Sequence, residues 1–184
     1  MEKPNYDFKE IYESFYIPIH RYLSRVAGPD EAEDLTQDVF IKINQSMDNF
    51  RGDVKLSTWV YRIATNVAID RIRRNKTSDR VSNDLVNEAA INSSVIDLNS
   101  QLIRKDMNDC IRLVVNDLPE QYRMILILKE FEGFKNAEIA IILEISIDTV
   151  KIRLHRARAK LKKEMDRKCN LYLDERCELA CERK

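Results

Sequence analysis

Two acidic residues in the first third of the chain, Asp34 and Asp38, have the spacing of a carboxylate pair. Residues four apart lie on one face of a helix, so the two groups could share a proton or a cation. A hard metal ion needs more oxygen ligands than these two, and no histidine or glycine-bearing loop accompanies them. The pattern therefore indicates a solvated acidic face or a docking surface for a basic protein, formed by Glu33, Asp34, Gln37 and Asp38.

Three cysteines near the C-terminus, Cys169, Cys177 and Cys181, are the second set of residues that could do chemistry. Cys177 and Cys181 would share a face of a helix, and three thiolates with His155 or an acidic residue could hold zinc. The spacing differs from the paired C-x-x-C of common zinc modules. A redox switch and a tail of incidental thiols therefore stay open as alternatives, and no other cofactor is expected.

Enzyme motifs are missing from the sequence. It contains no glycine-rich phosphate-binding loop and no H-E-x-x-H pattern, and its two histidines, His20 and His155, suggest no Ser/His/Asp arrangement. We therefore expect a protein that is not an enzyme and has no small-molecule substrate.

Residues 136–163 are typical of a helix-turn-helix. Apolar residues at Val150, Leu154, Ala157 and Leu161 form one stripe of the second helix, and Ser146 is a natural N-cap for it. Residues 151–168 hold nine basic and two acidic residues, a net charge of +7 in a chain whose formal charge is zero. Such a helix suits the DNA major groove.

A second candidate nucleic-acid surface lies upstream, in a polar loop and the helix after it. We expect Ser57 to cap this helix, which should end near Arg74. Its aromatic, arginine and asparagine side chains could stack unpaired bases and neutralise phosphates, although the tryptophan could equally be core. The candidates are Phe50, Arg51, Lys55, Trp59, Arg62, Asn66, Arg73 and Arg74.

Composition favours an all-α fold of two small helical domains joined by a flexible linker, the second domain containing the helix-turn-helix. The 184 residues are 44% hydrophobic and include only 3 glycines and 4 prolines, which leaves few turns. We expect a first domain over residues 1–76, a linker over 77–101, a second domain over 102–166 and a tail over 167–184. Without an apolar signal core or a membrane-length apolar run, a reducing cytoplasm is expected.

Charge is divided unevenly along the chain. Residues 1–54 hold six basic and eleven acidic residues, a net charge of −5, whereas the later segments are basic. This division suggests two kinds of partner, a basic protein surface and a nucleic acid.

Two long blocks resemble the sigma-70 type initiation factors of bacterial RNA polymerase, in the small extracytoplasmic-function group. The first block is AEDLTQDVFIKI at residues 32–43 followed by FRGDVKLSTWVYRIATNVAIDRIRR at 50–74. The second is LPEQYRMILILKEFEGFKNAEIAIILEISIDTVKIRLHRARAKL at 118–161. Both blocks occur in the family's order, separated by a linker of suitable length.

The resemblance implies a role for each surface. The acidic face would dock on the coiled-coil clamp of the polymerase large subunit, the loop from Phe50 would capture a flipped base of the minus-ten element, and the helix with Trp59 would hold the opened strand. The recognition helix would read the minus-thirty-five element through Thr149, Lys151, Ile152, Arg153, His155 and Arg156. The implied partners are core RNA polymerase, promoter DNA and an anti-sigma factor.

The chain also departs from the family pattern. Glu144 and Asp148 stand where the family often has glycine, and a left-handed non-glycine residue costs on the order of 1 kcal/mol. Ile152 replaces a small polar residue, which suggests contact with a thymine methyl group. The alternative function is a stand-alone helix-turn-helix regulator, with or without a thiol- or metal-sensing tail, but it leaves the acidic face and the upstream helix without a role.

Overall fold

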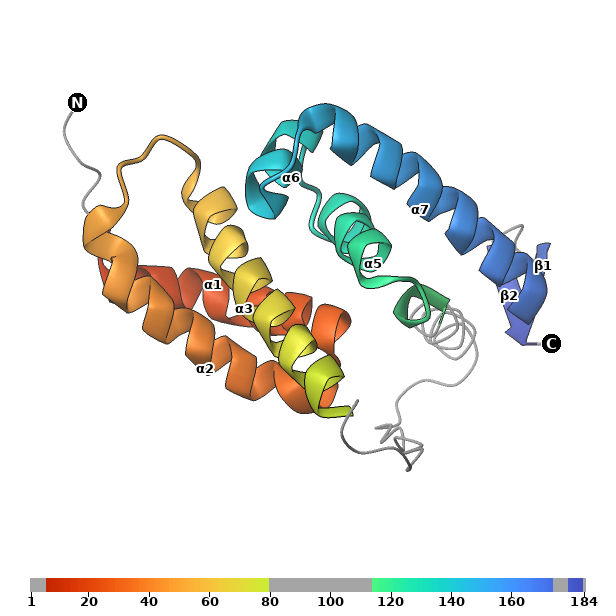
Figure 1. The fold of residues 1–184 in the computed structure, drawn as a ribbon, viewed down its shortest axis with the longest axis horizontal. Coiled ribbons are helices and arrows are strands. Elements are labelled where there is room, and N and C mark those ends of the chain that lie inside the picture. The colour runs from red at the N-terminus through yellow and green to blue at the C-terminus, as the bar shows by residue number, and fades with distance from the viewer. Residues whose placement is uncertain (1–5, 80–113, 174–178, 184) are drawn as a thin grey trace.

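The structure is a computed structural model that describes residues 6–79, 114–173 and 179–183 (Figure 1). Helices form two groups that lie side by side, and a short strand pair follows the last helix. In chain order the elements are α1 (Phe8–Ala27), α2 (Pro29–Ser46), the 3-10 turn η1 (Met47–Asn49), α3 (Leu56–Asp79), α5 (Glu120–Leu126), the π-helical turn η2 (Ile127–Phe131), α6 (Asn136–Leu143), α7 (Ile147–Lys168), β1 (Cys169–Leu173) and β2 (Leu179–Arg183).

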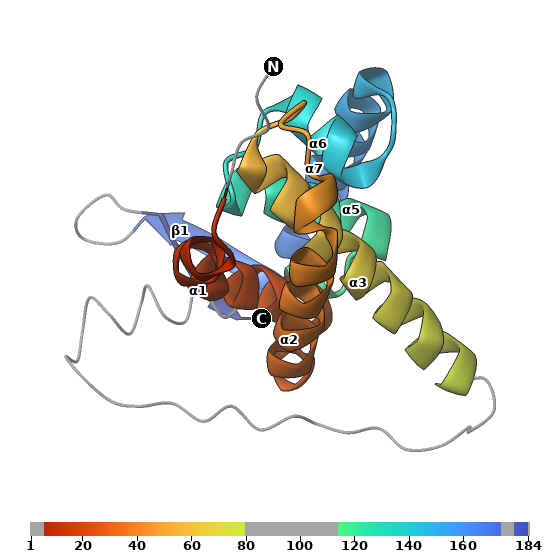
Figure 2. The same ribbon diagram turned by 90° about the vertical axis from the view of Figure 1, so that its left-hand side faces the viewer.

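The first group packs α1, α2 and α3 around one apolar core. In the view of Figure 2, α2 lies between α1 and α3. The helix α1 runs without interruption through Pro18, where the sequence suggested a bend or a break. Ile11 before the proline and Ile19 after it are both buried in the core, and this burial offsets the backbone hydrogen bond that proline removes.

Two boundaries in this group differ from the sequence prediction. The helix α3 begins at Leu56, so Ser57 lies inside its first turn rather than at the cap. At its other end α3 continues past Arg74 to Asp79, into the segment expected to be linker. Residues 80–113, which include the rest of that segment and the expected start of the second domain, lie outside the described residues.

The second group contains the expected helix-turn-helix. Glu144 ends α6 with φ +53°, the left-handed conformation of the turn, and Ser146 caps α7 by accepting a hydrogen bond from the backbone N–H of Thr149 at 3.1 Å. Upstream, α5 begins at Glu120 after Pro119, so Asp117 is not its cap. Gly133, at φ +74°, follows η2 and lets the chain turn towards α6.

The two groups are packed against each other, with α3 in contact with α6 and α1 in contact with η2. A continuous set of buried apolar side chains runs from the first group into the second. The expectation of two helical units is confirmed, and within the described residues they form one compact body.

The tail departs from the all-α prediction. The strands β1 and β2 pair antiparallel, with Cys169 opposite Arg183 and Leu171 opposite Cys181. Cys169, Leu171 and Leu173 alternate with Asn170 and Tyr172, the period of two that suits a strand. Among the described residues, no helix has the length and apolar character needed to cross a membrane.

We predict that Ser146→Ala lowers the free energy of unfolding by about 1 kcal/mol, because it leaves the N–H of Thr149 without its capping acceptor. Thermal unfolding followed by circular dichroism measures the change. Ser57→Ala is the matched control, since Ser57 caps no helix. Equal destabilisation by both substitutions would contradict the assigned cap.

Candidate protein-docking and nucleic-acid interfaces

The acidic face lies on the solvent side of α2. Glu33, Asp34, Gln37 and Asp38 are all exposed, because Leu35, Thr36, Val39 and Phe40 take the opposite side of the helix into the core. The alternation follows the period of 3.6 residues per turn. The structure therefore brings the four predicted residues together on one surface.

Neighbouring helices hold part of this face in place. The hydroxyl of Tyr16 on α1 donates to the Glu33 carboxylate at 3.0 and 3.2 Å, and this hydrogen bond raises the pKa of Tyr16. Arg71 on α3 lies 2.5 Å from the Glu31 carboxylate and 3.5 Å from that of Asp38. Glu33 and Asp38 therefore project from positions fixed by all three helices of the group.

Phe50 and Trp59, both predicted to stack bases, are instead part of the core. Each is only 7% exposed, and their ring centroids lie 5.0 Å apart. A stacked base needs a free aromatic face, so neither ring is available for stacking in this conformation. Their mutual packing anchors the loop between α2 and α3 to the helical core.

The other predicted residues of the loop and of α3 reach solvent. Arg51, Asn66, Arg73 and Arg74 are exposed and Arg62 is half-buried. Lys55 is also exposed, but its ammonium lies 2.8 Å from the carboxylate of Glu138 on α6. This hydrogen bond is the main cause of the lowered pKa of Glu138.

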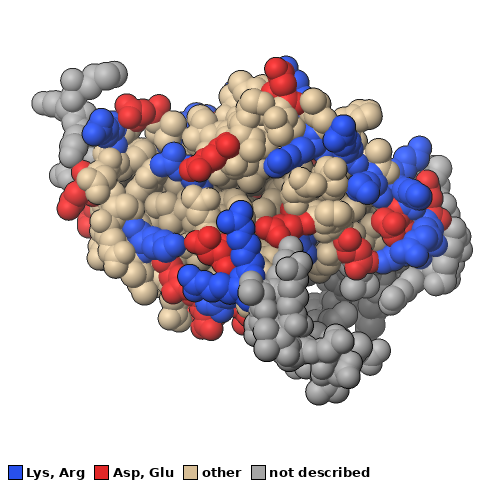
Figure 3. All heavy atoms as spheres, viewed as in Figure 1, with Lys and Arg blue, Asp and Glu red and all other residues tan. Residues whose placement is uncertain are grey.

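The recognition helix α7 presents its predicted residues as expected from the apolar stripe. Val150, Leu154 and Ala157 are buried, whereas the opposite side carries exposed Lys151, Ile152, His155 and Arg156 and half-buried Thr149 and Arg153. Figure 3 shows basic side chains along the length of this helix, on the right of the molecule. Asp148, which departs from the family pattern, pairs with Lys151 at 3.0 Å and neutralises part of the charge there.

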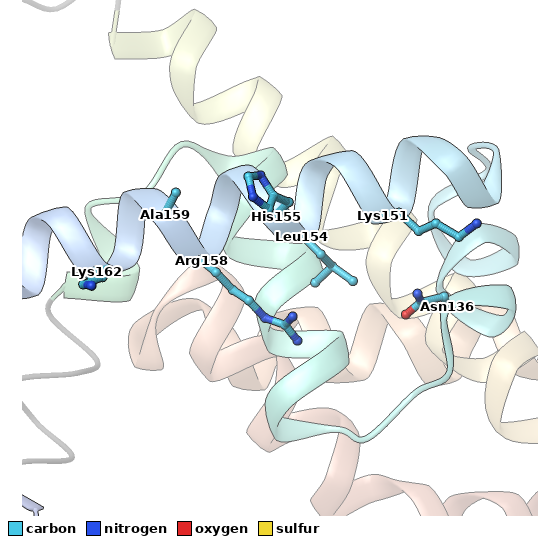
Figure 4. A pocket seen from close by; sticks show the side chains of 7 residues that line it. All are labelled: Asn136, Lys151, Leu154, His155, Arg158, Ala159 and Lys162. Carbon is cyan, nitrogen blue, oxygen red and sulfur yellow. The ribbon is translucent and has the colours of Figure 1, made fainter.

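One flank of α7 borders a groove of about 460 Å³ that the sequence analysis did not anticipate (Figure 4). Four basic side chains follow one another along it at steps of four, three and four residues: Lys151, His155, Arg158 and Lys162. The same spacing in the sequence could have revealed this stripe, since it repeats the apolar stripe one position later.

Two further residues give the groove its fixed polar groups. Arg158 donates to Glu130 of η2 at 2.6 and 3.1 Å, and Asn136 at the start of α6 lies across from Lys151 (Figure 4). The Oδ1 atom of Asn136 is buried without a hydrogen-bond partner. The groove extends the basic surface of the recognition helix beyond the predicted contacts and suits phosphate oxygens.

The cysteines do not assemble as a metal site in the part of the chain that is described. Cys169 is buried beside Val114 and is disulfide-bonded, so its sulfur is not a thiolate ligand here. Cys181 lies on β2, and Cys177 falls outside the described residues. Those residues contain no cluster of three potential metal ligands.

Solved structures with a similar fold are sigma factors bound to their inhibitors. The sigma factor RpoE in complex with the anti-sigma factor NepR from Bartonella quintana has a TM-score of 0.71 and 23% identity, covering 87% of this chain and 97% of that one. CnrH in complex with the cytosolic domain of CnrY has a TM-score of 0.61 and 22% identity, covering 87% and 88%. At these identities the comparison establishes the fold.

Sequence comparison establishes the family. The family model described as Sigma-70 region 2 matches residues 11–78, and that described as Sigma-70, region 4 matches residues 108–161. The RNA polymerase sigma factor SigZ of Bacillus subtilis is 33% identical over 169 residues, which cover 91% of this chain and 92% of that protein. The ECF RNA polymerase sigma factor SigW of the same organism is 33% identical over 165 residues, with coverage of 86% and 88%. The chain therefore belongs to the sigma-70 family, in its extracytoplasmic-function (ECF) group.

Proposed function

We propose that the chain is a promoter-specificity factor that binds core RNA polymerase, recognises promoter DNA and directs transcription initiation. The observation that carries the proposal is the pairing of two unlike surfaces on two helical units. An exposed acidic face on α2 suits a basic protein surface, and an exposed basic face on α7 suits a duplex. The curated relatives that match most of the chain are named as sigma factors.

In this proposal each surface has its own partner. The face formed by Glu33, Asp34, Gln37 and Asp38 docks on polymerase, and α7 reads the minus-thirty-five element. Arg51, Lys55, Arg62, Asn66, Arg73 and Arg74 contact the minus-ten region. Their guanidinium, ammonium and amide groups suit phosphates and unpaired base edges, whereas buried Phe50 and Trp59 support the loop.

The same reasoning sets the remaining features of the proposal. The chain acts by binding, in the cytoplasm, and not as an enzyme. It needs no cofactor, and zinc binding by the C-terminal cysteines is not included. An anti-sigma factor is a further partner, which is supported by the inhibitor complexes in which the similar folds were solved.

Transcription in vitro tests the proposal as a whole. The purified chain is added to core RNA polymerase with a library of genomic promoter fragments, and transcript starts are sequenced. Discrete new starts that share two spaced upstream motifs are expected. If the folded chain instead bound duplex DNA without polymerase and gave no new starts, the stand-alone regulator would be the better description.

For the polymerase-docking face, we predict that Asp34→Lys combined with Asp38→Lys abolishes binding to core polymerase, because it places two positive charges against a basic partner. A pull-down of the full chain with core enzyme measures this. Glu10→Lys with Glu13→Lys makes the same charge change on exposed positions of α1 and should leave binding intact. Retained docking by the α2 variant would refute the assignment.

For the recognition helix, we predict that Arg156→Ala weakens binding to duplex promoter DNA and lowers the slope of log K against log salt by about 1, as expected for one lost phosphate contact. Fluorescence anisotropy over a salt series gives both quantities. Arg167→Ala, at the far end of the same helix where Arg167 pairs with Glu164 at 2.7 Å, is the control. An unchanged slope and affinity would show that Arg156 does not touch DNA.

For base specificity, we predict that Ile152 contacts a thymine methyl group, since its side chain is 52% exposed on the recognition helix. Replacing each thymine of the minus-thirty-five element in turn by deoxyuridine removes only that methyl. One such replacement should weaken binding of the unmodified protein but have no effect on Ile152→Ser. If no replacement distinguishes the two proteins, Ile152 does not read a methyl group.

A further inference from the structure

A single carboxylate connects the two helical groups. Glu132, which follows η2, accepts hydrogen bonds from the guanidinium of Arg25 on α1 at 2.7 Å and from the hydroxyl of Tyr61 on α3 at 2.6 Å. The Glu132 side chain is only 10% exposed and that of Arg25 only 23%. These three side chains form a charged contact that is largely removed from water.

Aromatic packing surrounds this contact. The ring of Tyr61 meets the edge of Phe134 with centroids 4.7 Å apart, and the Arg25 guanidinium lies 5.0 Å from the centroid of Phe131. Burial is the main cause of the raised pKa of Tyr61, so its hydroxyl remains a donor across the physiological range. Both the apolar and the polar parts of the contact therefore hold the two groups together.

A second ion pair lies at the far end of the same interface. Lys55, in the loop assigned to the minus-ten region, bonds to Glu138 of α6 at 2.8 Å. Glu138 also accepts a hydrogen bond from the backbone N–H of Lys135 at 2.8 Å, which fixes its position at the start of α6. In this state the Lys55 ammonium already has an anionic partner that a DNA phosphate would have to replace.

The closed arrangement conflicts with simultaneous promoter contact. The minus-ten and minus-thirty-five elements are separated by roughly 25 base pairs, or about 85 Å of straight duplex. Two units that bind such distant elements cannot keep hydrogen bonds of 2.6 to 2.8 Å between them. The interface must therefore open before both surfaces can be used.

We propose that Glu132 and Glu138 form an intramolecular latch with Arg25, Tyr61 and Lys55, which keeps the unbound chain closed and must be released when polymerase and promoter are engaged. The proposal rests on the proposed function for its consequence, but its structural part stands independently. A carboxylate left buried without its cation is strongly unfavourable, so the latch is either formed or open rather than gradually loosened. The population of the open state then limits the apparent affinity for polymerase.

Arg25→Glu in the full chain tests the latch, because it sets two carboxylates against each other and lies outside the proposed DNA and polymerase contacts. The radius of gyration from small-angle X-ray scattering should increase. Apparent affinity for core polymerase should rise on the order of ten-fold, as expected when a closed state held by charged hydrogen bonds is removed. The double variant Arg25→Glu with Glu132→Arg restores opposite charges and should recover part of the compactness.

Glu164→Gln is the matched control, because Glu164 pairs with Arg167 inside α7 and not across the interface. It should change neither the radius nor the affinity. If Arg25→Glu loses its helical signal, Arg25→Gln deletes the charge without creating repulsion and carries the same expectations.

Three results would overturn the latch. These are an unmodified chain that is already extended in solution, a folded Arg25→Glu variant with an unchanged radius, or an increased radius without higher affinity for polymerase. If the variant opened as expected but the unmodified and variant chains both failed to bind core polymerase, the proposed function would fail while the closed contact remained established.

Discussion

Burial of one apolar stripe on each helix is the constraint on which the rest of this structure depends. Once Leu35 and Val39 of α2 face the core, the carboxylates between them can only face solvent, and the acidic surface follows. The same constraint on Val150 and Leu154 turns the lysines and arginines of α7 outward. Two surfaces of opposite charge thus arise from the packing of two helices.

The polar groups that are buried lie where the two helical units meet. Glu132 is tolerated at low exposure because a cation and a hydroxyl satisfy its oxygens. Such a contact adds specificity more than net stability, since desolvation offsets much of the attraction. An interface of this kind is compatible with two arrangements of the same helical units, which a protein with two distant binding sites requires.

Tertiary packing also reassigned residues whose chemistry suggested another role. Phe50 and Trp59 have the side chains of base-stacking residues, yet each fills space under the loop and stacks on the other. Arg158, which was expected only to contribute charge to α7, is fixed on Glu130 and borders a groove. Exposure, which residue type does not specify, decides between these roles.

The sequence by itself determined the helical class, the helix-turn-helix, its left-handed turn at Glu144 and the Ser146 cap, because all of these depend on local spacing and on residues close in the chain. It also determined which faces of α2 and α7 are charged. Only the tertiary structure decided that Phe50 and Trp59 are buried, that α1 continues through Pro18, that the tail pairs as strands, and that Lys55 and Tyr61 meet Glu138 and Glu132. These outcomes depend on contacts between residues far apart in the chain, and helical periodicity does not encode which helices meet.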